Sequence, residues 1–306
     1  MTQLVQLQSA LPTLHGAGYE VYAISNDTVE RLAEFAERHS ISFDLLADED
    51  SGVIRAFGIM NTLVEPGEGK HMRWYGIPYP GTFITDANGT IVDKDFHQHH
   101  ARRLSGPALA HRVLGTDPEP HRDAPMATTA DAELSVAASL TDPTLRLEVI
   151  SMMTVEIDIA HGRHIYAAGA PQAFTPVGLR VEGTGVRADA PIWPVPTALS
   201  MAELGMEVPV YTGKVRVSVP VTATSEIIRL GHGLDYDRAE VTITCSYQSC
   251  DEYACALPTT VQTTLCVPLE TLVEPPGIQS YADRVTRERT KALHQGSSRG
   301  THDPHD

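Results

Sequence analysis

Cysteine is missing from the first 240 residues of this 306-residue chain, and its four cysteines all lie between Cys245 and Cys266. Chemistry that needs a thiolate is therefore restricted to the C-terminal part of the sequence. Basic residues are also scarce, because 23 Lys and Arg stand against 39 Asp and Glu, for a formal net charge of −16. Since nucleic-acid binding depends on Lys and Arg at the phosphates, we expect no nucleic-acid partner.

Long apolar runs are absent as well. No stretch approaches the roughly 18 apolar residues of a membrane-spanning helix, so we expect no membrane span in this chain. Residues 1–8 contain neither a basic region nor a continuous apolar core, and no signal peptide is visible. The sequence therefore leaves the compartment open, which is cytoplasmic as the sequence is read and periplasmic if the N-terminus is incomplete.

Residues 1–115 show the alternating helix and strand patterns of an α/β domain. Leucines at helical spacing within residues 4–14 predict a first helix, and residues 27–30 predict the capping box of a second one. Asn88-Gly89 predicts a hairpin turn. The first strand, residues 19–25, is expected to be buried on both faces. The expected strands are residues 19–25, 43–46, 82–85 and 90–95.

The rest of the chain has a different composition. Residues 116–143 are rich in Pro, Asp, Ala and Thr with little periodicity, which predicts a linker. Residues 144–272 consist almost entirely of alternating strand patterns, which predict an antiparallel β-sandwich. Residues 273–306 predict a polar, partly disordered tail. The predicted fold class is therefore α/β plus all-β.

Cys250 and Cys255 bracket a polar four-residue loop between two strand-like segments. Two thiols held so close together form and break a disulfide with little movement of the chain, as a redox relay requires. A static structural disulfide is the alternative, although so short a loop gains little from restricting the unfolded chain.

Zinc binding is another use for four cysteines. Structural zinc sites usually take two pairs of cysteines, each pair separated by two to four residues, and the spacing here does not match. Strand parity instead places Cys245 in the core and Cys266 on the opposite face of its strand. We therefore favour the redox use of Cys250 and Cys255 and expect no metal or other cofactor.

The N-terminal part resembles the AhpC/TSA-type peroxiredoxin or redoxin branch of the thioredoxin-like fold. The resemblance covers residues 3–115 and rests on residues 21–25, 43–59 and 76–92. In this family a first strand and a loop with the reactive cysteine precede the segment that corresponds to residues 19–25. Neither is present here, so the resemblance implies a truncated domain without redoxin chemistry of its own. Either the true start lies upstream of Met1, or the domain is a degenerate redoxin kept as a scaffold.

The same resemblance marks a second position. Pro80 matches the proline that thioredoxin-like proteins hold in the cis form beside the active site. The resemblance therefore implies a cis bond between Tyr79 and Pro80, with Tyr79, Pro80 and Thr82 adjacent to the active site. The alternative is that Pro78 and Pro80 simply shape a loop.

The C-terminal part resembles the N-terminal domain of the DsbD thiol:disulfide interchange protein, an immunoglobulin-like sandwich. The resemblance is most specific where Tyr-Gln-x-Cys leads through the loop to Pro258. It implies that Cys250 and Cys255 are the exchanging pair. The matching residues are 164–167, 174–176, 192–194, 210–213 and 247–258. His164 follows a turn within this match, and we expect it to have a packing role.

Together these features predict a thiol–disulfide oxidoreductase of a redoxin-type antioxidant or disulfide-relay system. Its partner would be a thiol reductase or a disulfide-bearing protein, or the active site of a longer form of this chain delivered through the linker. Two alternatives stay open. The sandwich binds a partner without catalysis beside a degenerate redoxin half, or peroxidase activity belongs to a longer gene product.

Overall fold

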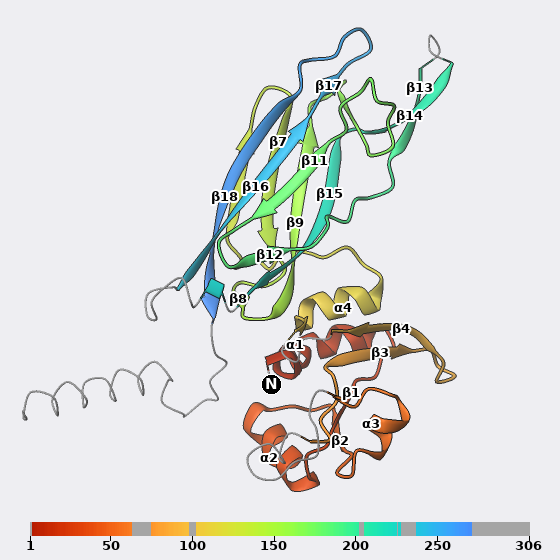
Figure 1. Ribbon diagram of the computed structural model, residues 1–306, viewed down its shortest axis with the longest axis vertical. Coiled ribbons are helices and arrows are strands. Elements are labelled where there is room, and N and C mark those ends of the chain that lie inside the picture. Colours follow the sequence, from red (N-terminus) through yellow and green to blue (C-terminus); the bar gives the residue numbers. More distant parts are fainter. Residues whose placement is uncertain are drawn as a thin grey trace, which may run out of the picture.

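The structure is a computed structural model that describes residues 2–62, 75–97, 102–201, 205–224, 226–227 and 237–270. The predicted tail, residues 273–306, lies outside the described residues. An α/β region (residues 2–115) lies at one end of the long axis, and a β-sandwich (residues 126–270) forms the rest of the molecule (Figure 1). No helix among the described residues is long and apolar enough to cross a membrane.

The α/β region is built from short elements. They are α1 (Thr2–Gly16), β1 (Tyr22–Ser25), α2 (Val29–His39), β2 (Asp44–Ala47), α3 (Gly52–Ala56), β3 (Gly81–Thr85), β4 (Ile91–Phe96), β5 (Arg103–Leu104) and α4 (Gly106–Leu114). β1 and β2 pair in parallel across α2. β3 and β4 form the predicted antiparallel hairpin, in which Gly89 has a φ of +80°, a conformation that glycine adopts without strain.

The prediction that the first strand is buried on both faces is wrong. β1 pairs only with β2, and this two-stranded sheet does not join β3 and β4 among the described residues. Ala23 and Leu45 pack against the cluster formed by α1 and α4, whereas Tyr22 and Ile24 on the other face are 58% and 44% exposed. A sheet of only two strands has few neighbouring elements, and here they cover only one of its two faces.

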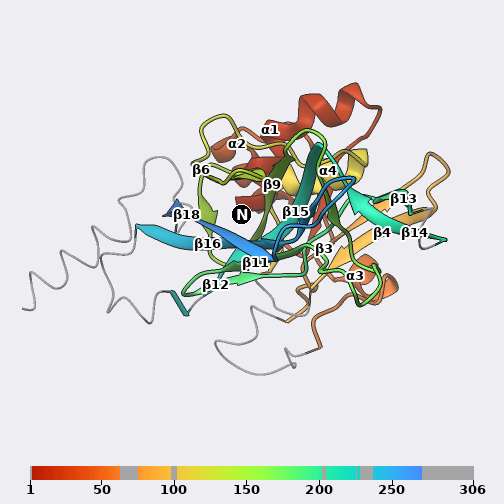
Figure 2. The ribbon, with the colours of Figure 1, turned by 90° about the horizontal axis from the view of Figure 1, so that it is seen from above.

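The sandwich contains thirteen named strands among the described residues. They are β6 (Met126–Ala130), β7 (Leu134–Leu140), β8 (Leu145–Arg146), β9 (Val149–Ile159), β10 (His164–Tyr166), β11 (Gly178–Glu182), β12 (Val186–Ala188), β13 (Thr197–Met201), β14 (Met206–Tyr211), β15 (Lys214–Ala223), β16 (Arg238–Tyr247), β17 (Ser249–Cys250) and β18 (Thr259–Glu270). The sheet β12-β15-β9-β7-β6 faces the sheet β11-β16-β18-β8, and a small sheet β13-β14-β10-β17 forms one end. In the view along the long axis, β11 and β16 lie below β9 and β15 (Figure 2).

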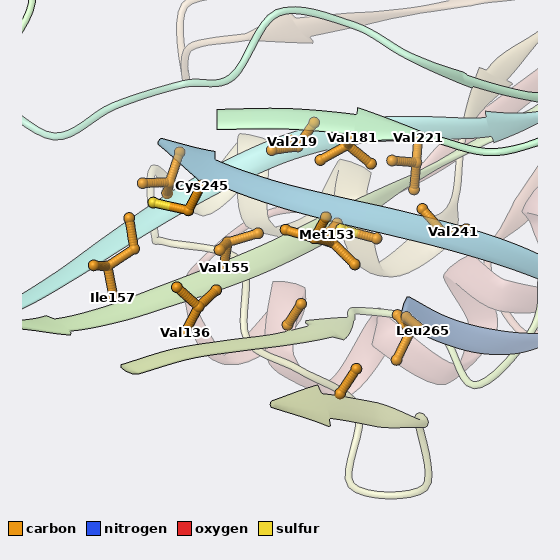
Figure 3. Close-up of a cluster of buried hydrophobic side chains, with 14 of the residues drawn as sticks. Val136, Met153, Val155, Ile157, Val181, Val219, Val221, Val241, Cys245 and Leu265 are labelled. Atoms are coloured by element: carbon orange, nitrogen blue, oxygen red, sulfur yellow. The ribbon is translucent and has the colours of Figure 1, made fainter. Parts of the chain in front are cut away.

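The core lies between the two large sheets. Alternate residues of the facing strands are fully buried there, as the sequence pattern predicted, and their side chains point toward one another (Figure 3). Val217 and Val219 come from β15, Val241 and Ile243 from β16. Cys245 continues the β16 series and is 0% exposed, which confirms its predicted place in the core.

The predicted linker is wrong for most of its length. β6 and β7 lie within residues 116–143, and β7 pairs with β9 from Met153 to its end at Ile159. Leu134 and Val136 of β7 are buried in the sandwich core. Small residues such as Ala and Ser occupy much of β7, so its alternation in hydrophobicity is weak even though the strand is central.

The α/β region and the sandwich share a packed interface. β5 pairs in parallel with the start of β9, and Ile150 and Met152 of β9 join the apolar cluster of α1 and α4. Asp142, only 1% exposed, accepts hydrogen bonds from Ser105 Oγ at 2.8 Å and from Gln6 Nε2 at 3.1 Å. The two parts therefore form one continuous body, which corrects the expectation of delivery through a flexible linker.

Candidate redox site

Cys250 and Cys255 form a disulfide, with 4.0 Å between their Cα atoms. The loop between them is ordered by Asp251, whose Oδ1 accepts hydrogen bonds from the N–H groups of Tyr253 and Ala254, both at 2.8 Å. Its own N–H donates to the carbonyl of Ala254 at 2.9 Å. A carboxylate that binds the backbone two and three residues ahead makes a tight turn, which brings the two cysteines together.

Gln248 of the Tyr-Gln-x-Cys segment fixes this loop to the sandwich. Its Nε2 donates to the carbonyl of Ala256 at 3.1 Å, and its Oε1 accepts from the N–H of Thr175 at 3.1 Å. Thr175 follows Phe174, and both belong to a segment that the sequence analysis singled out. One side chain therefore joins two of the predicted matching segments.

The two cysteines differ in exposure. Cys250 lies in β17 and is 1% exposed, whereas Cys255 is exposed in the loop. Tyr253 and Leu257, on either side of Cys255, are 92% and 86% exposed. A partner thiolate approaching the disulfide therefore meets Cys255 first.

Aromatic and aliphatic side chains surround the disulfide on its inner side. Cys250 packs with Tyr166, Val208 and Val210 in a small buried cluster. The hydroxyl group of Tyr166 lies 3.6 Å from Cys255 Sγ, and its ring lies 4.4 Å from that of Phe174 between centroids. Burial raises the pKa of Tyr166, so this hydroxyl stays protonated.

Charged groups lie on the outer side of the site. Arg163 contacts Glu133, with 3.1 Å from Nε to Oε2, and Asp251, with 3.3 Å from Nη1 to Oδ2. Glu133 also accepts a hydrogen bond from Ser249 Oγ at 2.8 Å. Hydrogen bonds from the N–H groups of Tyr253 and Ala254, followed by the charge of Arg163, lower the pKa of Asp251. The carboxylate therefore stays ionised beside the disulfide.

The structure places His164 in a position that the sequence did not predict. It stands directly opposite Cys250 in the antiparallel pairing of β10 with β17. Its ring lies edge-on to that of Tyr166, with 5.4 Å between centroids. Its Nε2 atom is buried and has no hydrogen-bond partner within the part of the chain that the structure describes. The prediction of a packing role missed this, because strand register is not visible in a single sequence.

Tyr79, Pro80 and Thr82 lie in the α/β region, far from β17 at the opposite end of the molecule (Figure 1). The N–H of Tyr79 donates to the carbonyl of Ile59 at 2.7 Å, and Thr82 pairs with Asp95 in the hairpin. No peptide bond of the described residues is cis, so the predicted cis bond before Pro80 is wrong. The trans form of such a bond is lower in free energy than the cis form by about 0.5–1 kcal/mol.

The other two cysteines are free thiols, with Cys245 buried and Cys266 exposed. Burial, and then the charge of Asp131, raise the pKa of Cys245 to about 12, which makes it unreactive at neutral pH. Within the described residues, no group of three or more His, Cys, Asp or Glu side chains is arranged to hold a metal ion.

Comparison with known families gives two separate matches. Residues 1–94 match the AhpC/TSA family, and residues 150–267 match the N-terminal domain of the thiol:disulfide interchange protein DsbD. The chain therefore joins an AhpC/TSA redoxin region of thioredoxin-like type to a DsbD N-terminal domain of immunoglobulin-like fold, and the whole is mostly β. Both expected resemblances are confirmed, as is the disulfide.

Individual proteins agree with these matches. Peroxiredoxin Bcp of Escherichia coli is 37% identical over 106 residues, which are 32% of this chain and 62% of that protein. A putative peroxiredoxin bcp of Haemophilus influenzae is 33% identical over 105 residues, which are 32% of this chain and 64% of that protein. The chain thus spans less than two thirds of the length of these relatives.

Two solved structures are also similar to the chain. The N-terminal periplasmic domain of ScsB from Proteus mirabilis is 14% identical and aligns over 53% of this chain and 54% of its own, with a TM-score of 0.31. The reduced DsbD N-terminal domain from Neisseria meningitidis is 16% identical and aligns over 47% of this chain and 84% of its own, with a TM-score of 0.26.

Proposed function

We propose that this protein is a thiol–disulfide oxidoreductase in which Cys250 and Cys255 alternate between a disulfide and two thiols. The observation that carries the proposal is the pairing of a buried cysteine with an exposed one in a turn at the free end of the sandwich. The DsbD-type match over residues 150–267 supports it, because both cysteines lie inside that match. The proposed partner is a thiol reductase or a disulfide-bearing protein.

The reaction follows from the exposure of the two sulfur atoms. A partner thiolate attacks Cys255 Sγ, a disulfide forms between the partner and Cys255, and the bond to Cys250 breaks. The electron pair goes to Cys250 Sγ, which takes up a proton. A second thiolate of the partner then attacks the partner's own sulfur in the mixed disulfide and releases Cys255 as a thiolate. The partner leaves oxidised, and this chain has gained two electrons.

The α/β region has a supporting role in this proposal. We propose that this redoxin region serves as a scaffold, since no cysteine occurs in residues 1–94. Its packed contact with β9 places it at the end of the sandwich opposite β17 (Figure 1). The partner thiol therefore comes from another molecule.

The test measures whether the pair exchanges electrons reversibly. The purified chain would be equilibrated with mixtures of reduced and oxidised dithiothreitol and then alkylated. Mass spectrometry would measure the fraction of protein in which the two thiols are alkylated. We expect a two-electron transition that disappears in the Cys250→Ser/Cys255→Ser double variant and persists in Cys266→Ser, which removes the exposed free thiol instead. A disulfide that resists reduction until the protein unfolds would contradict the proposal and indicate a static bridge.

A second candidate function is partner binding without catalysis. The exposed side chains of Tyr253 and Leu257 favour it, because large apolar groups beside a turn are typical anchors of protein interfaces. Reversible reduction of the disulfide separates the two candidates, since a binding module does not need it. Peroxidase activity in a longer gene product is a third possibility, and it would need a cysteine that residues 1–240 do not contain.

A further inference from the structure

Breaking the disulfide creates a problem at Cys250. The leaving sulfur carries a negative charge, yet Cys250 is 1% exposed and packs against Tyr166, Val208 and Val210. A charge without water or a partner is strongly disfavoured in such surroundings. A proton must therefore reach Cys250 Sγ as the bond breaks, and must leave it when the bond forms again.

His164 is placed to make this transfer. Residues directly opposite each other in an antiparallel pair have Cβ atoms about 4.5–5.5 Å apart and side chains on the same face. His164 and Cys250 are such a pair. The edge-on contact with Tyr166, which itself packs with Cys250, holds the imidazole over this face. Nε2 is buried and is not engaged by any described residue, so it is available to a neighbouring sulfur.

The other titratable groups around the site are already committed. The Tyr166 hydroxyl lies against Cys255, the sulfur that solvent reaches, and burial raises its pKa. Asp251 is held ionised by backbone N–H groups and by Arg163. Arg163 is paired with Glu133 as well. Burial lowers the pKa of His164, and Asp251 partly opposes this, so the imidazole is neutral at pH 7 and able to accept a proton.

We infer that His164 carries the proton to and from Cys250 during disulfide exchange. When the disulfide is reduced, His164, which is neutral in the resting protein, takes up a proton from solvent and passes it to Cys250 Sγ as the electron pair arrives there. When the chain reduces a partner, neutral His164 takes the proton from the Cys250 thiol. The resulting thiolate attacks Cys255 Sγ in the mixed disulfide and expels the partner thiolate. The inference deepens the proposed function and rests on it.

The Cys250 step can be observed by itself. In a Cys266→Ser background, the reduced protein would be mixed with 5,5′-dithiobis(2-nitrobenzoate) in a stopped-flow instrument between pH 5 and 9. The first thionitrobenzoate reports attack by Cys255, and the second reports attack by Cys250 on the mixed disulfide. For His164→Gln we expect the second phase to slow about 100-fold and to lose the inflection that follows imidazole ionisation. The first phase should stay within a few-fold of the parent rate.

The matched control is His161→Gln, because His161 is an exposed histidine in the turn just before β10. It should leave both phases unchanged. An unaltered second phase and pH profile in His164→Gln would overturn the inference while leaving the proposed function intact. Absence of a second phase in the parent protein would instead overturn the proposed function, and the inference with it.

A measurement on the parent protein keeps the inference testable if His164→Gln does not fold. Nuclear magnetic resonance would follow the His164 ring against pH in the disulfide and in the dithiol state. A proton shared with Cys250 should raise the pKa of His164 in the dithiol state. Equal pKa values in the two states would overturn the inference.

Discussion

Tyr247 is a buried side chain whose hydroxyl group has a charged partner. It is 0% exposed, and its hydroxyl donates a hydrogen bond to Asp131 Oδ2. Burial, followed by this carboxylate, raises the pKa of the hydroxyl, so it stays a donor at every physiological pH. Among the described residues the bond joins the end of β16 to the turn between β6 and β7, two elements far apart in sequence.

Tyr247→Phe should lower the free energy of unfolding by about 1.5–3 kcal/mol, the usual range for a hydrogen bond to a charged group. Urea unfolding at pH 7 measures it. Tyr253→Phe is the control, because Tyr253 is 92% exposed, and it should leave the midpoint unchanged. Equal midpoints for Tyr247→Phe and the parent would show that the bond contributes nothing.

The effect of Tyr247→Phe should depend on pH. Burial tends to raise the pKa of Asp131, but the hydrogen bonds from Tyr247 and from the N–H groups of Glu133 and Leu134 outweigh it and lower the pKa. A carboxyl whose pKa is lowered on folding stabilises the fold above its unfolded value, and this stabilisation is lost as the pH falls through the folded value. The difference between parent and variant should therefore be constant above about pH 5 and shrink below about pH 4. A difference that stays constant down to pH 3 would contradict this.

At the scale of elements, the sequence predicted those whose pattern is strong and local. Alternating apolar residues predicted β15 and β16, and Asn88-Gly89 predicted the β3–β4 hairpin. The sequence did not predict β7, because the small side chains in this central strand weaken its alternation in hydrophobicity. The disulfide loop was predicted from its residues, whereas the pairing of His164 with Cys250 depends on the register of β10 and β17, which only tertiary structure sets.

The side chain of Arg112 attaches the β3–β4 hairpin to α4. Arg112 Nε donates to Asp93 Oδ2 at 2.7 Å and Nη1 donates to Asp95 Oδ1 at 2.9 Å. Nη2 donates to the carbonyl of Lys94 at 2.9 Å. The hydrogen bonds from Arg112 are the main reason why the pKa of Asp93 falls to about 2. The planar guanidinium group fits these acceptors in a way that an ammonium group does not.

Arg112→Lys should therefore loosen the hairpin despite keeping the charge. Hydrogen exchange read by mass spectrometry should show amides of residues 81–96 exchanging a few-fold faster, with the sandwich strands unaffected. Arg122→Lys is the control, since the Arg122 side chain is 89% exposed and pairs with its neighbour Asp123. Unchanged exchange in the hairpin would mean that its own strand pairing suffices.

At the scale of the whole molecule, the contact between the two parts and the disulfide lie at opposite ends of β9. Ile150 and Met152 near its start pack against α1 and α4, and after Ile159 at its end the chain turns into β10. Nine residue steps of about 3.3 Å put roughly 30 Å between these ends. The arrangement in Figure 1 agrees, with β17 at the far end of the sandwich from the helices. A structural change in the α/β region can therefore leave the surroundings of the disulfide unaltered.

Asp142→Ala tests this separation. The substitution removes the buried carboxylate that accepts hydrogen bonds from Ser105 and Gln6. Arg146 loses one of its two carboxylate partners and retains the ion pair with Glu270, with 2.8 Å from Nη2 to Oε2. We expect the free energy of unfolding to fall by about 2–3 kcal/mol, because buried donors lose their partner. Hydrogen exchange in α1 and α4 should become faster. The rates of both thionitrobenzoate phases should stay within about twofold of the parent values, since the disulfide lies on the order of 30 Å from Asp142.

Asp142→Asn is the matched control, because its side-chain carbonyl still accepts a hydrogen bond from Ser105 or Gln6 while the charge beside Arg146 is lost. It should destabilise the fold less than Asp142→Ala does. If Asp142→Ala instead slowed the Cys250 phase while the sandwich amides kept their protection, the two ends of β9 would be coupled. The α/β region would then regulate the disulfide, and its role as a passive scaffold would have to be abandoned.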